Sequence, residues 1–130
     1  MIDHSGYSAL TRSFLTRELD NSSFHHREHV LVAYELLRNL SYTDAAFEYA
    51  TGIRTLAAKA GAPRKFNATI TYAFMSLIAE HMTMDKYDDF EDFAERNPEL
   101  FSKNLLERWY EPERLHSDFA RQAFLLPAAR

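Results

Sequence analysis

The densest group of residues that could do chemistry is the run His25-His26-Arg27-Glu28-His29. On a helix, His26 and His29 are neighbours at i, i+3. Imidazoles titrate near neutral pH, and a carboxylate beside them can orient the ring. We therefore take His26, Glu28 and His29 as candidate catalytic residues, with one histidine as general acid or base and Glu28 as its orienting partner. The run also matches the H-x-x-E-H zinc-protease pattern, which we reject because those domains are far larger than this chain.

A second candidate is a basic loop that runs into a helix, Arg64-Lys65-Phe66-Asn67-Ala68-Thr69-Ile70-Thr71. Free N–H groups at a helix N-terminus can hold a carboxylate or a phosphate. The pattern predicts a ligand site in which Asn67 and Thr71 bind the anion and Arg64 or Lys65 lies at the mouth. The alternative is that Asn67 is a plain N-cap and the two cations are solvated.

Two more side chains could line the same pocket, Tyr34 and His81. His81 lies on the apolar face of a helix predicted over residues 67–84, where a histidine is either a hydrogen-bonded core residue or a ligand. With His26 and His29 it could form a three-imidazole metal site. That alternative lacks an acidic ligand facing inward, since Glu80 lies off the apolar stripe. The sequence indicates no cofactor.

Composition limits the classes of protein to which the chain can belong. With 130 residues, of which 46% are hydrophobic, we expect one domain over residues 1–130. The absence of cysteine excludes disulfides, thiolate zinc sites, iron–sulfur clusters and a cysteine nucleophile, and it suits a cytoplasmic protein. No apolar run approaches the roughly 20 residues of a membrane span, so we expect no membrane partner. A net charge of -4 argues against a nucleic-acid partner.

The charges are unevenly distributed along the chain. Every charged residue between positions 49 and 79 is basic, whereas seven acids lie within residues 85–99. This asymmetry fits ordinary solvated helix faces, a basic mouth for an anionic ligand, or complementary faces in a homodimer.

Three glycines and four prolines leave little turn chemistry for strands, and the apolar spacing is helical nearly throughout. The fold is predicted to be all-α, a compact bundle of four main helices with short C-terminal helices packed over it. The main helices are expected over residues 8–19, 24–40, 43–60 and 67–84. Ser22 or Ser23 is expected to cap the second helix, and Gly61 to end the third in a left-handed conformation. Short helices within residues 87–126 are expected to cover the bundle.

The order of motifs resembles that of a family of small uncharacterised bacterial helical proteins. The resemblance covers most of the chain, through Phe24-x-His26-x-Glu28-His29-Val30, Gly52-Ile53-Arg54, Gly61-Ala62-Pro63, Lys65-Phe66-Asn67-Ala68-Thr69-Ile70-Thr71 and Trp109-Tyr110-x-Pro112-Glu113-Arg114-Leu115. It implies that the polar positions surround one pocket. The corresponding family motif in the fourth helix reads aromatic-His-Glu-Thr-Ile/Leu-Thr, so Asn67 and Ala68 depart from it. Either the chemistry here differs, or the protein is a non-catalytic binder.

Three functions follow from these observations. The leading one is a small-molecule-binding helical protein, with an anionic organic ligand held between the second and fourth helices and acid–base catalysis by the histidines if it is an enzyme. The first alternative is a protein–protein interaction module or homodimeric accessory protein, using the aromatic C-terminal third and the acidic stretch. The second alternative is a metalloprotein with His26, His29 and His81 as ligands.

Overall fold

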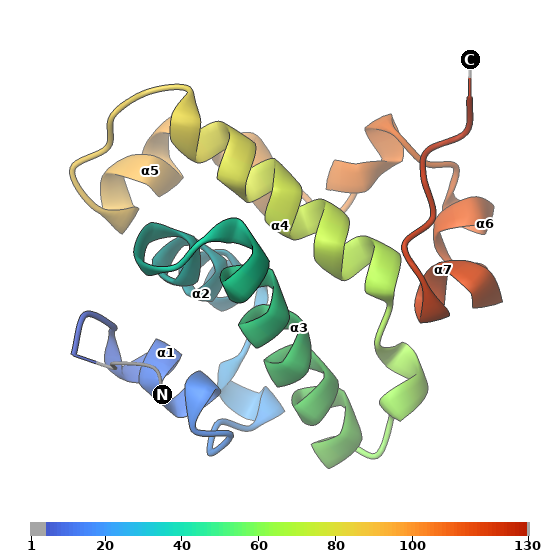
Figure 1. The fold of residues 1–130 in the computed structure, drawn as a ribbon, viewed down its shortest axis with the longest axis horizontal. Helices are drawn as coiled ribbons and strands as arrows, with labels where there is room; N and C mark the ends of the chain where they lie inside the picture. Colours follow the sequence, from blue (N-terminus) through green and yellow to red (C-terminus); the bar gives the residue numbers. More distant parts are fainter. Residues whose placement is uncertain (1–4, 130) are drawn as a thin grey trace.

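The computed structural model describes residues 5–129, which fold into helices joined by short turns, with no strand in that range (Figure 1). The helices are α1 (Ala9–Leu15), α2 (His26–Asn39), α3 (Tyr42–Lys59), α4 (Ala68–Thr83), α5 (Phe90–Arg96), α6 (Pro112–Leu115) and α7 (Asp118–Gln122). Four 3-10 turns lie between them, η1 (Asn21–Ser23), η2 (Pro63–Lys65), η3 (Pro98–Phe101) and η4 (Leu105–Arg108). The predicted all-α bundle is confirmed. No helix of the described range is long and apolar enough to cross a membrane.

The ends of α3 and α4 follow from local chemistry. Ser41 Oγ accepts a hydrogen bond from the backbone N–H of Asp44 at 3.2 Å, and α3 starts there. Just beyond the other end, Gly61 has a φ of 72°, the left-handed conformation that the sequence predicted. Asn67 Oδ1 accepts from the N–H of Ile70 at 2.9 Å and begins α4. These caps place Lys65 and Asn67 side by side at the start of α4.

The first helix and the second cap differ from expectation. α1 ends at Leu15 instead of residue 19, because Arg17 takes a left-handed φ of 69° and the N–H groups of Glu18 and Leu19 turn back to the carbonyl of Ser13. Neither Ser22 nor Ser23 caps α2, since both lie in η1. The N-cap is His25, whose backbone N–H donates to Glu28 Oε1 at 2.8 Å.

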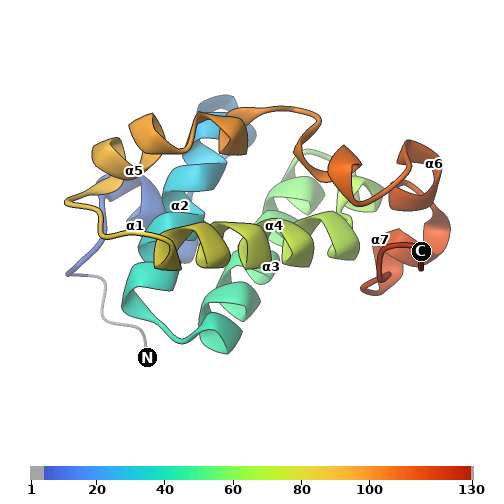
Figure 2. The same ribbon diagram turned by 90° about the horizontal axis from the view of Figure 1, so that it is seen from above.

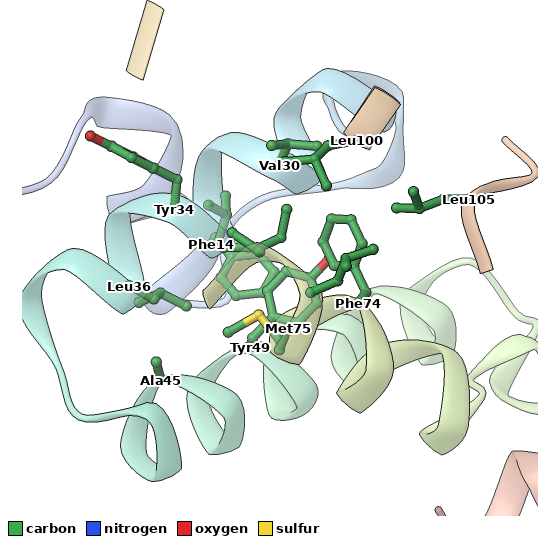
Figure 3. Packing of buried hydrophobic residues seen from close by; sticks show 14 of the residues in the cluster. Phe14, Val30, Tyr34, Leu36, Ala45, Tyr49, Phe74, Met75, Leu100 and Leu105 are labelled. Atoms are coloured by element: carbon green, nitrogen blue, oxygen red, sulfur yellow. The ribbon is translucent and has the colours of Figure 1, made fainter. Parts of the chain in front are cut away.

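The core lies where α2, α3 and α4 pack against one another (Figure 3). Val30, Leu36, Met75 and Ile78 are completely buried within it. Burial of one such side chain contributes about 1.5–3 kcal/mol, so these helices hold together mainly through apolar area. α5 and η3 pack on α2.

The C-terminal segment, residues 109–129, is hydrogen-bonded to the first turn of α4. α6 and α7 lie beside that end of the helix (Figures 1 and 2). Asn67 Nδ2 donates to the carbonyl of Leu115 at 2.9 Å. Thr69 is completely buried, and its hydroxyl donates to the carbonyl of Ala123 at 2.8 Å while accepting from the N–H of Leu125 at 2.9 Å. The prediction that short helices pack over the bundle is confirmed.

α1 and α3 approach closely at Gly52 of α3, where a Cβ atom would overlap the ring of Phe14. That ring is almost fully buried and stacks on Phe24 and Tyr49, with centroid separations of 5.5 and 5.9 Å. α3 must therefore lack a side chain at this position for α1 to dock.

Replacing Gly52 with Ala is expected to lower the free energy of unfolding by roughly 1–2 kcal/mol. Overpacking against Phe14 outweighs the gain of about 1 kcal/mol that alanine normally brings to a helix. Chemical denaturation measures the change. The same substitution in a Phe14→Leu background should be neutral or stabilising, because the ring is gone. Stabilisation by Gly52→Ala in the wild-type background would contradict this packing.

Candidate functional site

A cavity of about 400 Å³ opens between the N-terminal half of α2, the middle of α3 and the first half of α4. Its volume lies in the range of small-molecule sites. The residues that line it are His26, His29, Tyr49, Ile53, Lys65, Asn67, Ile70, Thr71, Phe74 and Lys103. No Asp or Glu is among them. The cavity therefore combines apolar walls with cationic and hydrogen-bonding groups.

His29 is a largely buried titratable group of the cavity, next to the buried Tyr49. Its Nδ1 lies 3.0 Å from the hydroxyl oxygen of Tyr49, and its ring packs on Phe24 at a centroid separation of 4.1 Å. Burial, and to a lesser degree the neighbouring His26, lowers the pKa of His29 to about 4. The imidazole is consequently neutral at pH 7.

Tyr49 fixes the tautomer of that imidazole. The side chain is buried, which raises the pKa of the phenol above its ordinary value and keeps the hydroxyl protonated. Within residues 5–129 the hydroxyl has no hydrogen-bond partner except His29 Nδ1, and donation to Nδ1 is the arrangement that gives the phenol proton an acceptor; we therefore assign the phenol as donor and Nδ1 as acceptor. The imidazole proton is then on Nε2, which makes no hydrogen bond to any described residue. His29 thus offers an N–H donor to the cavity.

His26 lies one turn before His29, with ring centroids 6.4 Å apart, and is exposed. Its Nε2 is 3.2 Å from the carbonyl oxygen of Leu100. A carbonyl can only accept, so Nε2 carries a proton, and Nδ1 makes no hydrogen bond to any described residue. The two predicted histidines line one cavity, but in different environments.

Glu28 does not orient either histidine as the sequence predicted. Its carboxylate turns back to the backbone N–H of His25 and caps α2. The physical reason is that a carboxylate at the third helical position is attracted by the free N–H groups of the first turn.

Asn67 and Thr71 line the cavity, and most of their side-chain hydrogen bonds are made within the fold. The amide of Asn67 accepts from Ile70 and donates to the carbonyl of Leu115, while the Thr71 hydroxyl donates to the carbonyl of Asn67 at 2.8 Å. These bonds cap α4 and attach the C-terminal segment, and anion binding by this turn stays a prediction. The cations that line the cavity are Lys65 and Lys103.

Tyr34, Arg64 and His81 lie outside this cavity. Tyr34 packs against Phe90 and Phe93 and lines a separate hollow. His81 Nδ1 lies 3.0 Å from the carbonyl of Leu77, and its Nε2 lies 3.4 Å from Glu99 Oε1. Arg64 lines an adjoining cleft.

The structure does not bring the three predicted metal ligands together. His81 belongs to the neighbourhood of Glu99, away from the cavity that His26 and His29 line. Across residues 5–129, no three His, Asp or Glu side chains are grouped so that they could hold a metal ion.

Sequence reasoning missed Tyr49 and Lys103. Tyr49 carries a detectable signal, because it is the one aromatic hydroxyl in the middle of an alanine-rich helix and a buried hydroxyl needs a partner. Lys103 lies on an irregular segment between η3 and η4, and no periodicity or motif points to it.

Comparisons with protein-family models, with curated proteins and with solved structures find no match to this chain. The resemblance to a family of bacterial helical proteins accordingly stays a prediction. The site has to be judged by its own geometry.

The buried His29 predicts a pH dependence of stability. In the unfolded chain this imidazole binds a proton near pH 6.5, whereas the folded protein binds it only near pH 4. Between these values the unfolded state holds more protons. The free energy of unfolding therefore decreases as the pH is lowered, by at most about 1.4 kcal/mol per pH unit from this group. Urea unfolding of the wild type should lose this increment relative to His29→Gln as the pH is lowered. An NMR titration of His29 centred at pH 6.5 would contradict the prediction.

Proposed function

We propose that this protein binds a small organic anion with an apolar body in the cavity between α2, α3 and α4. The observation that carries the proposal is the composition of the cavity wall. Ile53, Ile70 and Phe74 supply apolar surface, and Lys65 and Lys103 supply positive charge without an opposing carboxylate. Apolar surface with a few convergent polar groups is the usual chemistry of a ligand site.

The hydrogen bond from Tyr49 supports an anion as the guest. Because the phenol donates to Nδ1, the imidazole of His29 has an N–H at Nε2 and can donate to a carboxylate oxygen of a ligand in the cavity. A hydrogen bond to a charged group contributes about 1.5–3 kcal/mol, more than one between neutral groups. The donor, the cations and the apolar wall therefore favour the same class of ligand.

Binding is favoured over acid–base catalysis by His29. A general base works best when its pKa lies near the working pH, and burial lowers the pKa of His29 to about 4. Glu28, the expected orienting carboxylate, caps a helix instead. His26 keeps a free Nδ1 and is the histidine through which any proton transfer would pass.

A naphthalene series tests the proposal, because its members share one apolar body and differ in charge. Isothermal titration should give naphthoate the highest affinity, with neutral naphthol weaker and naphthylmethylamine weakest. Replacing both Lys65 and Lys103 with Met should weaken naphthoate binding roughly tenfold or more, since each ionic hydrogen bond contributes over 1 kcal/mol. Lys86→Met is the matched control, because Lys86 is exposed on the loop before α5.

The expected control result is wild-type affinity. Equal affinities for naphthoate and naphthylmethylamine would contradict the proposal of an anion site. Unchanged naphthoate affinity in the Lys65→Met, Lys103→Met variant would contradict it too. Absence of naphthoate binding to the wild type would also contradict the proposal. Circular dichroism of each variant separates lost affinity from lost folding.

An interaction module remains the second candidate, favoured by one observation. Trp109, Phe119, Phe124 and Leu126 expose 43–67% of their surface, all within the C-terminal segment. Exposed apolar side chains that gather in one region mark contact surfaces. Light scattering across a wide concentration range should detect a dimer if this surface pairs two copies, and Phe119→Ser should then shift the equilibrium to monomer. A monomer at all concentrations would contradict pairing through this surface, and ligand binding would then be the one proposed function.

A further inference from the structure

A second hollow, which we call the cleft, adjoins the cavity beside the basic loop at residues 61–65. This cleft has a volume of about 670 Å³ and is lined by Gly61, Ala62, Pro63, Arg64, Lys65, Asn67, Ile70, His116 and Arg121. It shares Lys65, Asn67 and Ile70 with the cavity. One molecule placed along the start of α4 could therefore contact both.

The charge lining the cleft is entirely positive. Arg64, Lys65 and Arg121 are the charged residues of its wall, with His116 beside them. Arg64 and Lys65 form no ion pair with any residue in the described range. Arg121 faces Asp118 at 3.5 Å, but their side chains are 39% and 81% exposed, and such a solvated pair contributes only about 0–1 kcal/mol. All three cations are thus available to an anion.

Both walls of the cleft are attached to the first turns of α4. Arg64 and Lys65 lie on η2, which ends immediately before the Asn67 cap of α4. His116 follows Leu115, whose carbonyl accepts from Asn67 Nδ2, and Arg121 lies on α7, which packs on α4. The cations on both sides are therefore anchored to the same helix turn. A backbone that is fixed before binding leaves only the side chains to be ordered when the ligand arrives.

The positive charge of the cleft contrasts with the acidic character of the rest of the molecule. The net charge is -4, and seven acids lie within residues 85–99. This acidic segment surrounds α5, at the opposite end of the molecule from α6 and α7 (Figure 2). The attraction for an anion is therefore local to the cleft wall, which has no acidic residue although Glu113 and Asp118 lie on α6 and α7.

We propose that the ligand is an organic phosphate monoester, with its phosphate in the cleft among Arg64, Lys65 and Arg121 and its apolar body in the cavity. Two guanidinium groups can each donate two parallel hydrogen bonds to phosphate oxygens, and a phosphate offers one more acceptor oxygen than a carboxylate. Three cations also match a dianion better than a single negative charge. This inference rests on the proposed function, because the body of the ligand occupies the same cavity.

The experiment compares naphthyl phosphate with naphthoate, again by titration calorimetry. For the wild type, naphthyl phosphate should bind roughly tenfold or more tightly than naphthoate. Arg64→Gln with Arg121→Gln should reduce naphthyl phosphate to the affinity of naphthoate and leave naphthoate within about twofold of wild type. Arg108→Gln is the matched control, because Arg108 is exposed on η4, lies over Trp109 and does not line the cleft, and it should change neither affinity.

The outcomes separate this inference from the proposed function. If naphthoate binds through Lys65 and Lys103 but naphthyl phosphate binds no more tightly, the phosphate assignment is wrong and the organic-anion site stands. A phosphate preference that survives in the Arg64→Gln, Arg121→Gln variant also overturns the assignment, since the phosphate would lie elsewhere. If neither anion binds the wild type, both proposals fail.

Discussion

The site depends on the seating of one aromatic ring, that of Phe14, against the bare backbone of Gly52. The ring stacks on Phe24 and on Tyr49, and these two residues are the neighbours that hold His29. Aromatic packing thus fixes the phenol relative to the imidazole. Because a buried hydroxyl must find an acceptor, the hydrogen bond between them follows from this packing and sets which ring nitrogen is protonated.

Burial and charge then act in opposite senses at the two ends of the cavity. At the closed end, desolvation keeps both His29 and Tyr49 neutral, so they hydrogen-bond without carrying charge. At the open end, Lys65 and Lys103 are exposed and remain solvated cations. The arrangement suits a ligand that combines an apolar body with an anionic group, because the cavity offers apolar walls, neutral hydrogen-bonding groups and cations. The cationic cleft continues from the open end, and the buried hydroxyl of Thr69 fastens the segment that forms its far wall.

The helices could be predicted because their signals are local. The apolar spacing located the second, third and fourth helices to within about two residues, and the φ of Gly61 and the cap at Asn67 follow from residue type alone. The end of the first helix was wrong, because the left-handed turn at Arg17 has no such signature. The placement of Tyr34 and His81 in the cavity was also wrong, since helical spacing gives a face of the helix and not the neighbour that covers it.

The sequence by itself determined the all-α class, the main helices and the pairing of His26 with His29, because a spacing of three residues on a helix is a matter of backbone geometry. Only the tertiary structure decided what each side chain does. Tyr49 meets His29 across 20 positions, and Asn67 reaches Leu115 across 48, through packing of distant elements. The same packing left Arg64, Lys65 and Arg121 around one cleft. Contacts between distant segments depend on how apolar faces fit together, and no local pattern encodes that fit.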